Sequence, residues 1–143
     1  MNDDSSIIID TGFFIALGNA KDKFHVPAKK ILKKIQNKKW ITTWPVLTET
    51  SYLLSQVSQK EYHRWIDSLS QGLCEIYSLK SEHLFRIQEL TIKYQDLPMD
   101  LADASLVVLA EDINHGDIVS TDQRDFQSYR WKTKRPFRNL LLE

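Results

Sequence analysis

The chain has 143 residues, with 19 basic and 19 acidic side chains that give a formal net charge of zero at pH 7. This length suits one domain, residues 1–143, and a hydrophobic content of 42 % favours a packed core over disorder. The single cysteine, Cys74, excludes an internal disulfide, and the short apolar runs are far from a membrane span. The N-terminus lacks the basic region of a signal peptide, so we expect a soluble, cytoplasmic protein.

The charges are segregated along the chain. Residues 21–39 hold eight lysines and one acid, residues 96–125 hold eight acids and one base, and residues 126–138 hold five bases and no acid. Solvated helix faces account for most of the single lysines. Basic segments beside an acidic pocket would also suit a polyanion that the pocket alone would repel.

The first half of the chain alternates strand and helix signals. Residues 6–9 predict a short buried strand that ends at Asp10, and residues 13–17 begin a helix that Gly18 can stop. Apolar residues spaced i, i+3, i+4 and i+7 predict an amphipathic helix over residues 28–35, with lysines on its other face. Residues 40–43 predict a second strand, and Pro45 fits the first turn of the following helix.

The second half continues the alternation. Asn114 and Gly116 mark the end of its last helix. The remaining expected helices cover residues 62–69, 82–94 and 99–112, and the remaining strands cover residues 73–79 with Cys74, 118–120 and 137–142. This order predicts an α/β fold of three layers, α-β-α, with a mainly parallel sheet of four or five strands and helices on both faces.

Several acids fall where such a sheet places its ligands. Asp10 and Asp122 each follow an apolar strand, and Glu49 lies one turn into the helix after the second strand. Asp100 and Asp103 share one helix face, although capping alone could explain one of them. Asp122 and Asp125 repeat that spacing, and one of these two could likewise be only a cap.

Four or more carboxylates at one sheet edge would repel one another, and a divalent cation would balance them. Oxygen ligands suit Mg²⁺ or Mn²⁺ rather than Zn²⁺. The four histidines form no HxxxH pair, and with one cysteine they do not predict a zinc site. A metal-activated water in such a site suits the hydrolysis of phosphodiesters.

Four segments resemble, in order, the signature regions of PIN-domain ribonucleases, and most closely the VapC-type toxins of toxin-antitoxin pairs. The resemblance spans most of the chain, from Ile7 to Arg130. The segments are residues 7–17 (IIIDTGFFIAL), 44–54 (WPVLTETSYLL), 94–111 (YQDLPMDLADASLVVLAE) and 119–130 (VSTDQRDFQSYR).

The resemblance assigns the site residue by residue. It implies a catalytic and metal-binding set of Asp10, Glu49, Asp103 and Asp122, with Asp103 preferred to Asp100 because the family's element there is Asp-Ala. Asp100 and Asp125 become auxiliary ligands, and Thr11 and Thr121 match hydroxyl residues that orient neighbouring carboxylates.

The resemblance also implies an activity and partners. It implies an endoribonuclease that uses Mg²⁺ or Mn²⁺ and leaves 5′-phosphate and 3′-hydroxyl ends. It further implies a homodimer and, for the toxin branch, a small antitoxin protein that covers the acidic groove. Candidate RNA contacts are Arg124, Arg130, Lys132 and the lysines of residues 29–39, with Trp131 a candidate for stacking on a base.

Two other functions remain open. A PIN-like module could bind RNA or a protein without cutting, although the acids are retained. An aspartate-based phosphotransfer protein also carries an aspartate after its first strand, but a phosphatase of that kind needs a second aspartate where this chain has Gly12. For His25, a helix-surface or capping role is expected, and the other tryptophans are expected in the core.

Overall fold

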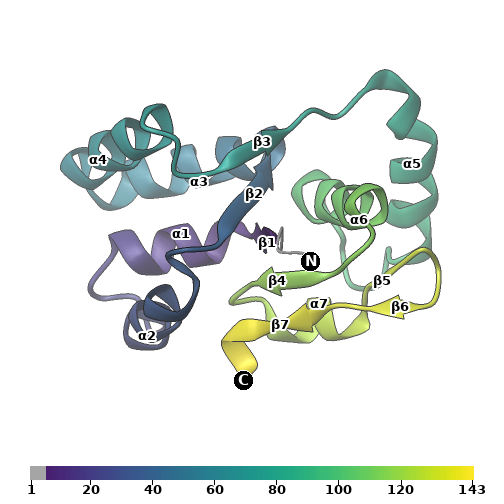
Figure 1. Ribbon diagram of the computed structural model, residues 1–143. Helices are drawn as coiled ribbons and strands as arrows, with labels where there is room; N and C mark the ends of the chain where they lie inside the picture. Colours follow the sequence, from purple (N-terminus) through teal and green to yellow (C-terminus); the bar gives the residue numbers. More distant parts are fainter. Residues whose placement is uncertain (1–5) are drawn as a thin grey trace.

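The computed structural model describes residues 6–143, and a five-stranded parallel sheet lies between helices on both of its faces (Figure 1). The strand order is β3-β2-β1-β4-β7, and every neighbouring pair is parallel. The predicted three-layer α/β fold is therefore confirmed. Residues 1–5, which carry part of the signal-peptide argument, lie outside the described residues.

Three central strands set the edge at which the expected site lies. These strands are β1 (Ser6–Ile9), β2 (Lys39–Thr43) and β4 (Asp117–Val119), and Ile8 of β1 pairs with Ile41 and Ile118. Almost all of their side chains are buried, which is the pattern of strands covered on both faces. Because the strands are parallel, their carboxyl ends meet at one edge.

The edge strands are shorter than predicted. The third strand, β3 (Glu75–Tyr77), has three residues, and the half-buried Cys74 precedes it instead of lying in it. The last strand, β7 (Arg138–Asn139), has two residues, and a 3₁₀ turn (Leu140–Leu142) replaces the rest of the predicted strand. Asn139 ends this strand because its side-chain oxygen accepts the backbone N–H of Leu141.

Residues 6–143 hold seven helices, and those before α7 follow the apolar spacing of the sequence. In α2, Ala28, Ile31 and Ile35 are buried while the lysines face outward. Helix α6 is buried over most of its length, which explains its nearly continuous apolar sequence. The helices are α1 (Thr11–Gly18), α2 (His25–Ile35), α3 (Trp44–Val57), α4 (Gln59–Ser70), α5 (Leu84–Lys93), α6 (Leu101–Ile113) and α7 (Gln123–Ser128).

Two elements near the C-terminus were not predicted. Helix α7 has only six residues, too few to show a clear apolar period. Strands β5 (Arg130–Trp131) and β6 (Arg135–Pro136) form an antiparallel hairpin whose turn places Lys132 and Thr133 at positive φ. Glycine or asparagine usually marks such a turn, and neither is present.

Trp44 is a further correction, because it was expected in the core and is 60 % exposed at the first position of α3. Trp40 and Trp65 are buried as expected. None of the helices within residues 6–143 has the length and apolar character needed to cross a bilayer.

Candidate active site

Asp10 is the most buried carboxylate at the sheet edge, with 6 % of its surface exposed. It follows β1 directly and caps α1, where its Oδ1 accepts the backbone N–H of Thr11 at 2.7 Å. Its Oδ2 accepts the Ser120 hydroxyl, also at 2.7 Å. Burial raises the pKa of Asp10 to about 6, and repulsion by Glu49 and Asp122 adds to this rise while the two hydrogen bonds oppose it.

Glu49 reaches the same edge from the second turn of α3. The Thr11 hydroxyl donates to Glu49 Oε1 at 2.7 Å, so one residue contacts Asp10 through its backbone and Glu49 through its side chain. This is the kind of contact that the orienting role predicted for Thr11 requires. It links the acid of β1 to the acid of α3.

Asp103 and Asp100 together form the capping box of α6. Asp100 Oδ1 accepts the backbone N–H of Asp103 at 2.8 Å, and Asp103 Oδ2 accepts that of Asp100 at 3.4 Å. Burial raises the pKa of Asp103 to about 8, and repulsion by Asp10, Asp100 and Asp122 adds to this rise. The structure thus gives Asp100 a capping contact and turns Asp103 toward the other acids.

Asp122 caps α7, and its Oδ1 accepts the backbone N–H of Asp125 at 3.3 Å. Burial raises the pKa of Asp122, and the adjacent Asp125 carboxyl raises it further. Asp125 is itself buried and pairs with the guanidinium of Arg124 at 2.9 Å. Arg124 is largely exposed, so it can also present charge to an approaching anion.

Ser120 is a site residue that the sequence reasoning missed. Its hydroxyl donates to Asp10 and accepts the backbone N–H of Asp122 at 2.9 Å, which joins the two strand-end acids. Thr121 lies against Gly12, and its orienting role stays a prediction. The available signal was the position of Ser120, the first residue after β4 and two before Asp122.

The arrangement of the acids at the sheet edge bears on the Mg²⁺ or Mn²⁺ site that the sequence predicts. Within residues 6–143, no three histidine, cysteine, aspartate or glutamate side chains converge as a ready-made ligand set. The oxygen-only donors nevertheless suit Mg²⁺ or Mn²⁺, which commonly take one or two carboxylates and complete their shell with water and substrate oxygens. Burial raises the pKa of Asp10, Asp103 and Asp122, and repulsion by neighbouring carboxylates adds to each rise, so a cation would offset part of this negative charge.

Three residues that the sequence offered as RNA contacts, Trp131, Arg130 and Lys132, make contacts within the protein. Trp131 is 7 % exposed and its indole N–H donates to the Pro136 carbonyl, so the proposal that it stacks on a base is wrong. Arg130 donates to the carbonyls of Gln127 and Tyr129, and the Lys132 ammonium donates to Asn114.

His25 begins α2, and its Nδ1 lies 2.7 Å from the Ala16 carbonyl oxygen in α1. A capping contact of this kind was expected from the sequence, although it is made to the neighbouring helix rather than to its own. The contact ties the start of α2 to the end of α1, the helix that Asp10 caps. His25 therefore serves the packing of the helices beside the acidic edge.

Gly12 is required by close packing within the site. A Cβ atom at this position would lie 1.8 Å from Thr121 Oγ1. Alanine normally stabilises a helix by about 1 kcal/mol relative to glycine. Here we expect Gly12→Ala to lower the free energy of unfolding by about 1 to 3 kcal/mol, because the clash outweighs the helix preference.

Urea unfolding of Gly12→Ala in two backgrounds measures this effect. Thr121→Ala removes the clashing oxygen, so the cost of Gly12→Ala should fall in that background. An equal cost in the wild-type and Thr121→Ala backgrounds would contradict the packing argument.

Comparison with known proteins identifies the family of this fold and acidic edge. Residues 7–132 match the model of the PIN domain family, and the chain belongs to that family. Ribonuclease VapC26 of Mycobacterium tuberculosis is 25 % identical over 125 residues, which cover 87 % of this chain and 92 % of that protein.

Two solved structures share the fold. VapC20 of Mycobacterium tuberculosis, described as a Sarcin-Ricin loop cleaving toxin, superposes with a TM-score of 0.71 at 20 % identity, over 81 % of this chain and 89 % of its own. VapBC2 of Rickettsia felis, bound to a DNA fragment from its promoter, gives a TM-score of 0.63 at 17 % identity, over 94 % and 98 %. These comparisons confirm the resemblance to VapC-type PIN domains.

Proposed function

We propose that this protein is a Mg²⁺- or Mn²⁺-dependent endoribonuclease, the toxin of a toxin-antitoxin pair. The observation that carries the proposal is the set of electrostatically coupled acids, Asp10, Glu49, Asp103 and Asp122, at the carboxyl edge of a PIN fold. The match to a protein named Ribonuclease VapC26 supports RNA as the substrate.

Asp10, Glu49, Asp103 and Asp122 would hold the ion directly or through water, with Asp100 and Asp125 as auxiliary groups. When bound, such an ion supplies an activated water and stabilises the leaving oxygen of a phosphodiester. Thr11 and Ser120 fix the carboxylates of Glu49 and Asp10 through 2.7 Å hydrogen bonds. Their hydrogen bonds favour the charged carboxylates and limit their rotation.

The basic residues would act on the RNA backbone. Arg124 lies beside Asp122 and is largely exposed, and the lysines of α2 point to solvent. Their charge would offset the repulsion between RNA phosphates and the acidic edge. Arg130 and Lys132, which donate to neighbouring protein groups, would contribute through their remaining donors.

A small antitoxin that covers the acidic edge and a homodimeric state are proposed as well. The VapBC2 structure from Rickettsia felis supports a partner protein, since its name designates a VapB and a VapC component. Co-expression with a small open reading frame that adjoins the gene, followed by size-exclusion chromatography with light scattering, measures the oligomeric state and the binding of an antitoxin. A chain that elutes as a monomer alone and with that gene product would contradict both parts.

Incubation of the purified protein with RNA in Mn²⁺ or Mg²⁺ tests the proposed activity. We expect internal cleavage that stops when EDTA is added in excess over the metal, because the acids alone cannot balance the charge of a phosphodiester. New ends should carry 5′-phosphate and 3′-hydroxyl groups. Cleavage that persists in EDTA would contradict the metal-dependent mechanism.

A non-cleaving module that binds RNA or a protein is the second candidate. The observation that favours it is the exposed charge of Arg124 and of the α2 lysines, which would bind RNA phosphates without a metal. Binding of RNA without cleavage under either metal would support this candidate against the nuclease.

A further inference from the structure

We propose that Tyr129 is a positioning residue for Asp103. Its phenol hydroxyl donates to Asp103 Oδ2 at 3.2 Å across 26 positions of sequence. The inference rests on the proposed nuclease function, because Asp103 is one of the four acids assigned to the metal. Tyr129 itself would touch neither metal nor RNA and would act through the Asp103 carboxylate.

The ring of Tyr129 is fixed on several sides. It is fully buried and packs edge-on against Tyr94 and Phe126, each with a centroid distance of 5.0 Å. The backbone that follows is also held, because the N–H of Arg130 donates to the Tyr94 hydroxyl at 3.0 Å. A buried ring with such neighbours has little freedom, so its hydroxyl is a stationary donor.

The hydrogen bond joins two segments that each carry an acid of the site. Asp103 lies in the first turn of α6, while Tyr129 ends the helix α7 that Asp122 begins. The contact therefore fixes the separation of Asp103 and Asp122. Without the phenol, the remaining donor to Asp103 Oδ2 is the backbone N–H of Asp100 at 3.4 Å, which draws the carboxylate back toward its own helix.

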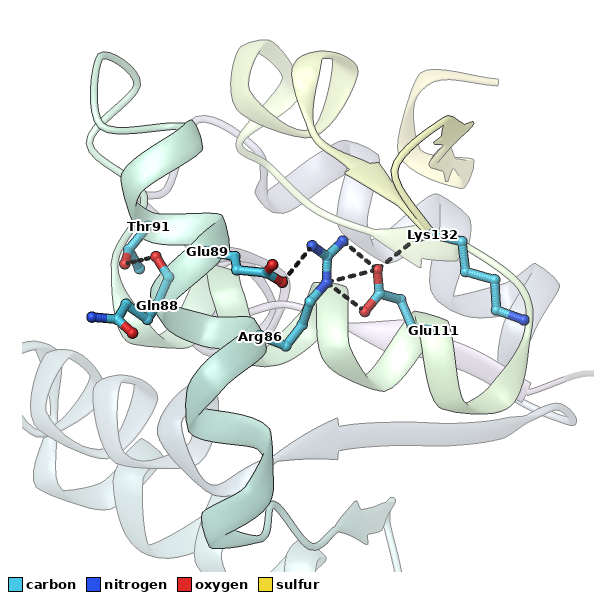
Figure 2. Close-up of polar contacts among 6 residues, drawn as sticks. All are labelled: Arg86, Gln88, Glu89, Thr91, Glu111 and Lys132. Carbon is cyan, nitrogen blue, oxygen red and sulfur yellow. Dashed lines mark hydrogen bonds and ion pairs between the residues drawn. The ribbon is translucent and has the colours of Figure 1, made fainter.

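A second clamp, formed by the contacts of Glu111, holds the C-terminal end of α6 against the same C-terminal segment of the chain (Figure 2). Glu111 accepts three hydrogen bonds from the Arg86 guanidinium of α5, the shortest at 2.7 Å, and a fourth from the backbone N–H of Lys132 at 2.7 Å. Helix α6 is thus pinned near both ends, at Asp103 by Tyr129 and at Glu111 by the hairpin turn. This second clamp limits sliding between α6 and the segment that carries Tyr129.

Tyr129→Phe removes the hydroxyl and keeps the buried ring. Loss of a partner that orients a metal-binding carboxylate typically costs about 10- to 100-fold in metal affinity or activity. We expect a loss in this range in Mn²⁺ affinity, measured by isothermal titration calorimetry, and a comparable fall in kcat for RNA. Tyr62→Phe is the matched control, because it removes a part-buried phenol that accepts a hydrogen bond from the Ser51 hydroxyl and contacts no carboxylate.

Thermal unfolding of both variants separates positioning from stability. The inference requires similar melting temperatures for Tyr129→Phe and Tyr62→Phe, together with weaker Mn²⁺ binding for Tyr129→Phe alone. Equal Mn²⁺ affinity in the two variants would overturn it. Failure of Tyr129→Phe alone to fold would also overturn it, since the hydroxyl would then be a stability element. A wild-type chain that binds no Mn²⁺ and cuts no RNA would instead refute the proposed function.

Discussion

Replacing Asp10 with asparagine should abolish RNA cleavage and leave the protein at least as stable as the wild type at pH 7. Asparagine caps a helix as well as aspartate does, so α1 keeps its N-terminal hydrogen bond. The substitution also removes a charge from a group that is only 6 % exposed. Burial raises the pKa of Asp10 to about 6 from 3.8, a difference of about 2 units or roughly 3 kcal/mol, which is the upper limit of the gain in stability.

The rate of RNA cleavage by Asp10→Asn should fall, whereas its stability should not. An amide carries no negative charge for a divalent ion, so the loss should exceed the roughly 10- to 100-fold cost of losing an outer partner of a metal ligand. RNA cleavage rates in Mn²⁺ and urea unfolding curves measure the two effects on one preparation. Asp67→Asn is the matched control, because it makes the same chemical change at an exposed position of α4.

The cleavage rate and the free energy of unfolding of Asp10→Asn have to be interpreted together. A variant that loses activity because it unfolds would show a lower free energy of unfolding. An Asp10→Asn protein that cleaves RNA at the wild-type rate would refute the assignment of Asp10. A variant that is both inactive and clearly less stable would show that Asp10 serves the fold, not the chemistry.

Capping and catalysis are not alternatives in this protein. In the sequence, helix capping alone could explain one acid of each closely spaced pair, Asp100 with Asp103 and Asp122 with Asp125. In the structure, Asp10, Asp100 and Asp122 are all N-caps, and Asp103 completes a capping box. The positive end of a helix dipole stabilises a nearby carboxylate. The N-termini of α1, α6 and α7 therefore offset part of the repulsion among the carboxylates at this edge.

The sheet and its acidic edge could be predicted because they depend on local patterns. Short apolar runs followed by Asp10 and Asp122 predict β1 and β4 and the polar residues after them, and the amphipathic spacing of α2 predicts its buried face. The exposure of Trp44 could not be predicted in the same way, because residue type alone does not tell which side of a helix end faces solvent.

The contacts missed from the sequence are all long-range. Ser120 reaches Asp10 across 110 positions, and Tyr129 reaches Asp103 across 26. The position of Ser120 next to a strand end marks it as a site candidate, but only the packed sheet and helices show which acid each side chain contacts. The prediction that Trp131 stacks on a base was wrong for a similar reason, because the unpredicted hairpin buries its ring and satisfies its indole N–H.

The metal-free protein should become more stable as the pH falls from about 8.5 to about 5.5. The pKa of Asp10 is raised to about 6 and that of Asp103 to about 8, both above the value of 3.8 for an exposed aspartate. In this window the folded chain keeps protons that the unfolded chain has released. Stability is therefore present at low pH and is lost as the pH rises through the two folded pKa values.

Urea unfolding in EDTA at pH 5.5, 7 and 8.5 measures this slope. The variant Asp103→Asn should lose the part of the slope above pH 7, where Asp103 titrates and Asp10 is already charged. Mn²⁺ at saturating concentration should raise the stability most at pH 8.5, because an ion binds the deprotonated acids and opposes their repulsion. Stability that rises with pH in EDTA would mean that these carboxylates are not held in a buried, mutually repelling set, and the case for a cation at this edge would lose its physical basis.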